Sequence, residues 1–147
     1  MQTTVKDILA KKGNQIFTVS ADSTVYDALK VMADNNIGSV LVMDGDKMVG
    51  IFTERDYARK LILKGKYSKD TPIKEVMTEK VISIKPEATT EACLALMTEK
   101  RIRHLPVMQD GKVIGLISIG DVVKQIIEDR ESYIRDLERF ITGDYAL

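Results

Sequence analysis

The chain has 147 residues, of which 44% are hydrophobic and 30% are charged, so it is long enough to bury a sizeable core. Its 22 basic and 22 acidic residues balance, and with 5% aromatic residues and no recognition motif they predict no nucleic-acid partner. No uncharged apolar run approaches the roughly 20 residues of a membrane helix, and residues 1–6 lack a signal peptide's apolar region. We therefore expect a cytoplasmic protein that does not enter a membrane.

The first half of the chain predicts the order strand, helix, strand, strand, helix. Residues 16–19 alternate as a short strand does, and a helix is predicted to begin at Ser23 or Thr24 and end near Asn36. Residues 40–43 and 48–52 are apolar runs of strand length. The Asp-Gly between them is typical of a hairpin, because glycine accepts the positive φ of such turns. A second helix is predicted from about residue 54 to residue 63.

The second half repeats this order. Residues 16–62 align without a gap on residues 81–127 when the chain is shifted by 65 positions. The shift predicts a strand over 81–84, a further hairpin and a helix from 120 to about 130. A unit of roughly 60 residues would be marginally stable alone, so we expect the two units to share one core.

Four segments follow from the alignment. Residues 5–9 match residues 73–77 at a shift of 68, so three extra residues fall in a loop of the first unit. We assign a first repeat, a solvated linker, a second repeat and a helical tail at residues 5–66, 67–72, 73–130 and 131–147.

The last helix of each unit carries an apolar stripe wider than one sheet contact needs. It has two adjacent rows, Tyr57, Leu61, Val122, Ile126 and Ala58, Ile62, Val123, Ile127. We expect part of it to contact another chain, most simply in a homodimer. The helical tail continues the apolar pattern at Ile134, Leu137 and Ile141, which packs either on a partner or on its own domain.

Both repeats end a strand with Gly-apolar-x-Thr/Ser-x-x-Asp, at 50–56 and 115–121. Two tandem units of this kind resemble a CBS domain pair, a family named after cystathionine β-synthase, over about residues 5–130. The resemblance implies an α/β (α+β) fold in which β-α-β-β-α repeats pack as a pseudo-twofold pair, the Bateman module. It also implies two clefts for adenosine-type ligands and further association into a flat disc.

The chemistry of the motif has two interpretations. Thr53 and Ser118 lie where a strand enters a helix, a place where free N–H groups and the helix dipole favour an anion such as phosphate. Asp56 and Asp121 can each accept two hydrogen bonds from a ribose. The same Thr/Ser-x-x-Asp pairs are also typical of capping boxes that only begin a helix. Recurrence in both repeats favours the ligand-binding interpretation.

The two clefts are not predicted to be equivalent. Arg55 stands beside Asp56 and could bind a phosphate, whereas Gly120 occupies that place in the second repeat. The resemblance implies that the segment before the middle strand lines a cleft, with Arg103 and His104 reaching a phosphate or pyrophosphate. This segment comprises Arg103, His104, Leu105 and Pro106 in the second repeat, with Pro106 bounding the base, and corresponds to Gly38, Ser39, Val40 and Leu41 in the first.

The resemblance further implies an adenine contact from the first strands, at Thr18, Val19, Ile37, Val81, Ile82 and Ile102. These residues could equally be ordinary core. His104 could be a packing histidine, and without a second histidine or a cluster with Cys93 no metal site is predicted. Cys93 lies in a helical stretch and is expected to be a buried small hydrophobe.

The leading hypothesis is a regulatory module that binds an adenine nucleotide and modulates a target protein. AMP and NAD or NADH are favoured over ATP, because about one to three basic groups per cleft suit one or two phosphates; ADP and S-adenosylmethionine stay open as alternatives. The alternative is a structural dimerisation module with empty clefts. An enzyme is not predicted, because the sequence has no phosphate loop, dinucleotide fingerprint or nucleophile motif.

Overall fold

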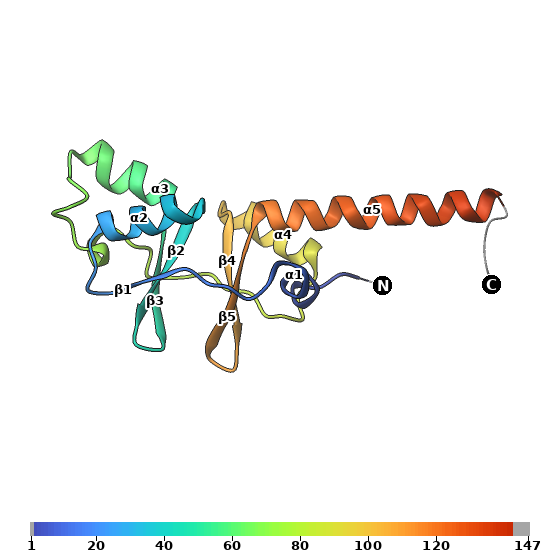
Figure 1. Cartoon of the computed structure of the whole chain (residues 1–147), viewed down its shortest axis with the longest axis horizontal. Coiled ribbons are helices and arrows are strands. Elements are labelled where there is room, and N and C mark those ends of the chain that lie inside the picture. The colour runs from blue at the N-terminus through green and yellow to red at the C-terminus, as the bar shows by residue number, and fades with distance from the viewer. Residues whose placement is uncertain (1, 143–147) are drawn as a thin grey trace.

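A computed structural model describes residues 2–142 of the chain (Figure 1). In the first half the helices and strands are α1 (Val5–Lys12), β1 (Thr18–Ser20), α2 (Val25–Asn35), β2 (Ser39–Asp44), β3 (Lys47–Thr53) and α3 (Glu54–Asp56). The helix that begins as α3 continues as a π-helical turn (Tyr57–Leu61) and a 3-10 turn (Ile62–Lys64). The second half has a 3-10 turn (Ile73–Glu75), α4 (Thr90–Lys100), β4 (His104–Gln109), β5 (Lys112–Ser118) and α5 (Ile119–Thr142).

Most of these helices and strands begin and end where the caps and turn residues in the sequence predicted. Thr24 caps α2 by accepting from the Asp27 N–H at 3.3 Å, and Asn36 ends that helix with a left-handed φ of 52°. Gly45 and Gly111 have φ values of 61° and 77°, as the hairpin turns require. The β-α-β-β-α order of the first repeat is therefore confirmed.

The sheets are less alike than the repeats. β1 pairs in parallel with β2, and β2 pairs antiparallel with β3, whereas β4 and β5 form a two-stranded sheet. The strand predicted over residues 81–84 was wrong, because only Ile84 bridges to Val107. The Val81 N–H donates to the Glu79 carbonyl at 3.0 Å, and this tight turn bends the chain away from a ladder.

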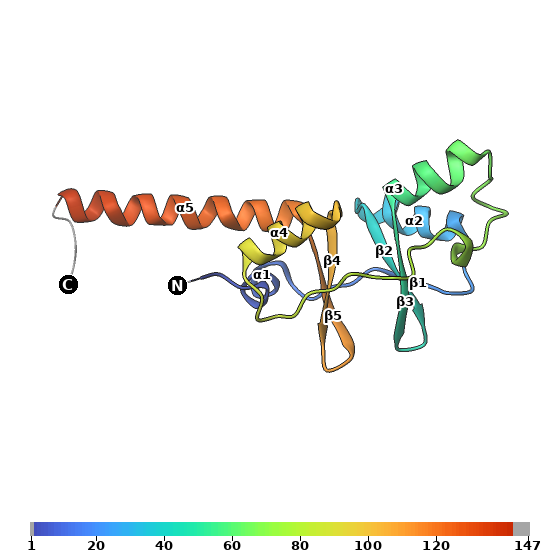
Figure 2. The same cartoon turned by 180° about the vertical axis from the view of Figure 1, so that it is seen from behind.

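The prediction of one shared core was also wrong, because the buried apolar residues form two clusters, one in each repeat. Each cluster is completed by the segment that precedes the other repeat. Val5, Ile8 and Leu9 of α1 pack against β4, β5, α4 and α5, whereas Ile73 and Val76 pack in the first cluster. Figure 2 shows α1 beside the β4–β5 hairpin, so the repeats are joined by two crossing segments.

Cys93 is fully buried in the second cluster, as predicted. Burial raises the pKa of its thiol to about 11, so it remains a neutral thiol at physiological pH. Within residues 2–142, none of the helices combines the length and the apolar character that a membrane crossing needs.

The C-terminal part of the second repeat and the predicted tail form one continuous helix, α5, up to Thr142. Val122 is buried against the second cluster, whereas Val123 and Ile127 of the predicted outer row are exposed. The helix then extends away from the two sheets (Figure 1). The rest of the predicted tail, residues 143–147, lies outside the described residues.

Candidate functional site

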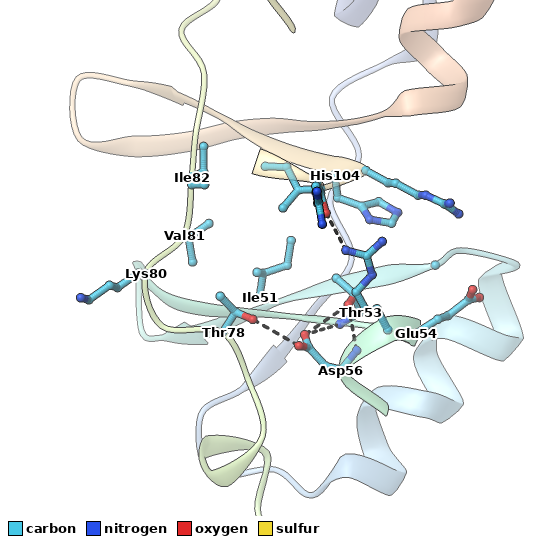
Figure 3. A pocket seen from close by; sticks show the side chains of 14 residues that line it. Ile51, Thr53, Glu54, Asp56, Thr78, Lys80, Val81, Ile82 and His104 are labelled. Carbon is cyan, nitrogen blue, oxygen red and sulfur yellow. Dashed lines mark hydrogen bonds between the residues drawn. The ribbon is translucent and has the colours of Figure 1, made fainter. Parts of the chain in front are cut away.

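A cavity of about 230 Å³ lies between the two repeats (Figure 3). The first repeat contributes the end of β3 and the start of α3, and the second contributes the segments that precede β4 and α4. We call it the first cleft. Its lining residues are Gly38, Ile51, Thr53, Glu54, Arg55, Asp56, Thr78, Lys80, Val81, Ile82, Arg101, Ile102, Arg103 and His104.

Thr53 and Asp56 form one wall of the first cleft. The Thr53 N–H donates to Asp56 Oδ2 at 3.0 Å and the Asp56 N–H donates to Thr53 Oγ1 at 3.2 Å, so the pair forms the capping box that was the alternative interpretation. The other oxygen, Oδ1, accepts from the Thr78 hydroxyl at 3.3 Å and lies 3.1 Å from Lys60 Nζ. A buried carboxylate with this many donors is held in one orientation.

The helix that begins at Glu54 continues through a π-helical turn and a 3-10 turn to Lys64, so its N-terminal end lies at this cleft. Two of its first N–H groups already have acceptors, because the Glu54 N–H donates to the Gly38 carbonyl at 3.1 Å and the Asp56 N–H donates to Thr53 Oγ1 at 3.2 Å. Anion binding here therefore relies mainly on cationic side chains.

Four cationic side chains surround the cavity, and two carboxylates accompany them, Glu54 and Asp56. The cations are Arg55, Lys80, Arg101 and Arg103. Arg55 Nη1 donates to the Arg101 carbonyl at 2.6 Å and so links the repeats. That carbonyl is free to accept because Arg101, with a φ of 54°, ends α4. The phosphate-binding role predicted for Arg55 would require it to leave or share this acceptor.

His104 begins β4 and is half-buried beside the first repeat. Burial lowers the pKa of its imidazole, the Glu54 carboxylate opposes this, and the charges of Lys12 and Arg103 lower it further. The ring lies close to Gly38, where an added Cβ would be 3.3 Å from His104 Nε2. Gly38 thus allows the close approach. Among residues 2–142 no group of three or more potential ligands could hold a metal ion.

Apolar side chains line the opposite wall of the cavity. Ile51 comes from β3, whereas Val81 and Ile82 come from the extended segment before α4. Figure 3 shows Ile51 and Val81 facing each other, with Thr78 below them and Lys80 turned outward. Ile102 adds to the same apolar lining. This combination can hold a flat apolar group beside a charged one.

Several predicted site residues lie outside the first cleft. Val19 and Leu105 do not line it, and their side chains are buried in the two hydrophobic clusters. Pro106 is also buried, and its carbonyl accepts from the Ile84 N–H at 3.0 Å. Three more from the first repeat are the exposed Thr18, the buried Ser39 and the partly buried Ile37, which packs on the first cluster.

The second copy of the motif, Ser118 and Asp121, is covered by the chain itself. Lys12 Nζ donates to Asp121 Oδ2 at 2.6 Å and to the Leu116 carbonyl at 2.7 Å. The Ser118 N–H also donates to Asp121 Oδ2 at 2.8 Å. The small cavity beside Asp121, of about 100 Å³, opens toward α1 and α5 and not toward residues 37–39. The two copies of the motif therefore have different surroundings.

A model of the CBS domain matches residues 5–63 and, a second time, residues 73–128. The chain belongs to the CBS domain family. A relative from Arabidopsis thaliana, CBS domain-containing protein CBSX3, mitochondrial, is 39% identical over 97% of this chain and 74% of its own length. The recognition of a CBS pair from its doubled motif is confirmed.

Solved structures of CBS pairs have the same fold. A protein with CBS domains from Burkholderia ambifaria MC40-6 is 54% identical, with a TM-score of 0.83 over 86% of this chain and 96% of that chain. The CBS domain pair of protein MJ0100, in complex with 5′-methylthioadenosine and S-adenosyl-L-methionine, is 27% identical with a TM-score of 0.78, over 88% of this chain and 99% of that chain. The pseudo-twofold pair of repeats is therefore the observed architecture.

Lys12 gives this CBS pair a testable pH dependence. Burial raises the pKa of Asp121, but the hydrogen bonds from Lys12 and from the Ser118 N–H outweigh it, and the net shift is downward from 3.8. A depressed carboxyl pKa stabilises the fold above the unfolded value and loses that contribution as the pH falls through the folded value. Lys12→Met should therefore lower the free energy of unfolding by about 1 kcal/mol at pH 7. The difference should shrink as the pH falls below 3.8 toward the lowered pKa of Asp121, down to the part that the Lys12 bond to the Leu116 carbonyl contributes.

Urea unfolding at pH 7 and at pH 3 measures this effect. Lys11→Met is the matched control, because the Lys11 side chain is 61% exposed and its ion pair with Glu128 should contribute almost nothing. A loss that persists undiminished at pH 3 would mean that Lys12 stabilises the pair through its hydrogen bond to the Leu116 carbonyl and not through Asp121.

Five lining residues of the first cleft were not found from the sequence: Ile51, Glu54, Thr78, Lys80 and Arg101. Lys80 could have been found from the alignment, because it corresponds to Lys12 at the shift of 68, whereas Thr78 corresponds to Ala10 and was not marked by it. Glu54 and Arg101 have no counterpart of like charge in the other repeat, so nothing in the sequence singled them out.

Proposed function

We propose that the protein is a regulatory module that binds an adenine nucleotide in the first cleft. The observation that supports this most strongly is the convergence of an apolar wall, three arginine side chains and the Thr53–Asp56 pair on one cavity built by both repeats. The MJ0100 pair, solved with two adenosine-containing ligands, shares the fold. A ligand in this position would contact both repeats and could favour one arrangement of them over another.

The charge of the cleft favours one or two phosphates. Lys60 neutralises Asp56, and Lys80 turns outward (Figure 3). Arg55, Arg101 and Arg103 against Glu54 therefore leave two net positive charges when His104 is neutral. AMP, with about two negative charges, would balance them, and the pyrophosphate of NAD or NADH carries a similar charge. ATP would bring about two further negative charges with no cation to meet them, so AMP and NAD(H) are preferred over ATP.

Each part of the nucleotide has a proposed set of partners. Asp56 would accept from the ribose hydroxyls, with Oδ1 exchanging its bonds from Thr78 and Lys60 for bonds from the ligand. Arg101 and Arg103 would bind phosphate. The adenine would lie between the apolar side chains Ile51, Val81, Ile82 and Ile102.

The second cleft is proposed to remain without a nucleotide. The Asp121 carboxylate already forms an ion pair with Lys12. The positions that correspond to Arg101 and Arg103 hold the uncharged Asn36 and Gly38. We therefore expect one nucleotide per chain, a value that isothermal titration calorimetry measures directly.

Thermal unfolding with a ligand panel tests the proposal. The panel contains AMP, NAD, NADH, ADP, ATP and S-adenosylmethionine, with GMP and inorganic phosphate as controls for the base and for charge alone. A ligand at 100 times its dissociation constant adds about 2.7 kcal/mol. For a chain of this size the Tm should rise by about 5–10 °C. A rise with AMP or NAD(H) and none with phosphate is expected.

The alternative is a structural dimerisation module. Both motifs form hydrogen-bonded caps, and Arg55 already has an acceptor in the Arg101 carbonyl, so the fold is satisfied without ligand. No Tm shift across the whole panel, together with an intact oligomer, would favour this function over nucleotide binding.

A further inference from the structure

The outer half of α5 carries large apolar side chains that its own domain does not cover. Tyr133 is 65% exposed, Ile134 52%, Leu137 43% and Ile141 81%. In both Figure 1 and Figure 2 the helix extends well past α4 and α1, and no other helix or strand of residues 2–142 runs beside its outer turns. Exposed apolar side chains gathered on one helix indicate an interaction surface.

These side chains belong to a regular stripe that begins on the body of the protein. Spacings of four and three residues alternate along it, the repeat of a coiled-coil seam. The stripe consists of Val123, Ile127, Arg130, Ile134, Leu137 and Ile141, and we call it the α5 stripe. Val123 and Ile127 are exposed although they lie where α5 packs on its domain, because Val122 and Gln125 provide the buried face there.

We propose that the α5 stripe binds the α5 stripe of a second copy of this chain, with the two helices antiparallel. A second copy is the occupant whose surface fits, because the stripe is self-complementary in that orientation. Its pairs would be Val123 with the partner's Ile141, Ile127 with the partner's Leu137, and Arg130 with the partner's Ile134.

Arg130 decides between the two orientations. In a parallel pair in register, each seam residue faces its own copy, so two Arg130 guanidinium groups would meet inside the seam. Like charges buried against each other are strongly unfavourable. In the antiparallel pair Arg130 faces an apolar side chain and can extend its guanidinium past it to the Glu131 carboxylate at the seam edge.

The flanks of the stripe bear on the same choice. One flank is apolar, with Ile126 and Tyr133, and the other is charged, with Lys124, Glu131 and Glu138. An antiparallel pair brings like flanks together, so Tyr133 would meet the partner's Tyr133 and Lys124 would meet the partner's Glu138. Glu131 would face the partner's Glu131 beside the two Arg130 guanidinium groups, which can neutralise both. A parallel pair would set the apolar flank against the charged one and bury carboxylates beside apolar groups.

Disulfide cross-linking in the full-length chain tests the orientation. The buried Cys93 is first replaced by alanine to leave no native thiol. Tyr133→Cys, close to the proposed twofold axis, should cross-link with itself on mild oxidation. Ile127→Cys and Leu137→Cys should each give little product alone but cross-link when mixed. Efficient self-linking of Ile127→Cys and Leu137→Cys would show a parallel pair and overturn the proposal.

Light scattering after gel filtration tests the surface itself. The native chain should have the mass of a dimer or of a multiple of it, and Leu137→Glu should at least halve that mass. Ser132→Glu is the matched control, because it adds the same charge on the exposed opposite face of α5 and should leave the mass unchanged. Circular dichroism confirms that α5 remains helical.

Two results would overturn the proposal. The first is a native chain that is monomeric at about 100 µM, a concentration more than tenfold above a micromolar dissociation constant. The α5 stripe would then bind a different protein and not a second copy. An unchanged mass of Leu137→Glu would place the interface elsewhere. The ligand-induced Tm shift is measured in the same variants, and because α5 beyond residue 123 does not line the first cleft, it should not depend on the dimer.

Discussion

Asp56→Asn should weaken AMP binding to the first cleft by about tenfold to a hundredfold. The substitution keeps the shape of the side chain but removes the charge and one of two acceptor oxygens that face Thr53 and Thr78. Hydrogen bonds to a charged group contribute about 1.5–3 kcal/mol, which corresponds to that range of affinity. Isothermal titration calorimetry at fixed ionic strength measures the change, with the binding stoichiometry from the same titration.

Asp121→Asn is the matched control for this prediction. It makes the identical chemical change in the other repeat, where Lys12 occupies the carboxylate, and should leave the AMP affinity within about twofold. The Tm of each variant without ligand shows whether the loss of a cap or an ion pair has weakened the fold. Equal losses of affinity in both variants would contradict the assignment of binding to the first cleft. A change confined to Asp121→Asn would place the nucleotide in the second.

Most of the fold could be predicted from the sequence, because the signals for its helices and turns are local and occur in both repeats. Helix caps such as Thr24 and hairpin glycines such as Gly45 depend on a few neighbouring residues, and recurrence at a constant shift separated them from coincidence. The doubled Thr/Ser-x-x-Asp motif identified the family for the same reason. Both copies form the capping hydrogen bonds, so the capping interpretation is confirmed, and ligand binding by the same motif stays a prediction.

Which of the predicted site residues share one cleft could not be predicted, because this depends on which repeat each connecting segment packs against. Arg103 and His104 belong to the second repeat in sequence but line the same cavity as Thr53 and Asp56 of the first. Arg55 donates across the same boundary to the Arg101 carbonyl. Periodicity specifies the buried face of an element and does not specify its partner.

The difference between the clefts arises from a single side chain in a crossing segment. Lys80 and Lys12 correspond in the alignment, yet Lys12 bonds Asp121 whereas Lys80 turns away from the cavity centre (Figure 3). The helix α1 continues up to Lys12, whereas the matching 3-10 turn ends at Glu75 and the chain then pairs with β3 at Thr78. Different local conformation of similar sequence therefore separates an open cleft from a covered one.

Gly50→Val should lower the free energy of unfolding by about 3 kcal/mol, because the segment that crosses from the second repeat lies directly on this glycine. A Cβ at Gly50 would lie 2.5 Å from Met77 Sδ and 3.1 Å from the Thr78 carbonyl oxygen. The flexible Met77 side chain can move, but Thr78 is held to Ile51 by backbone hydrogen bonds of 2.8 Å and 3.0 Å. Displacing Thr78 would also remove its hydrogen bond to Asp56, so AMP binding should weaken together with stability.

Gly115→Val and Gly120→Ala complete the experiment. A Cβ at Gly115 would lie 2.7 Å from Leu9 Cδ2 of α1, so this variant should lose a similar amount of stability through the other crossing segment. Gly120 has only Ser118 Oγ nearby, at 3.5 Å, and lies in α5, so alanine there should stabilise by about 0.5 kcal/mol. Urea unfolding of the three variants gives the comparison. Both valine variants could instead be as stable as the native chain. The two crossing segments would then not hold the repeats together, and other contacts would have to fix the cleft between the repeats.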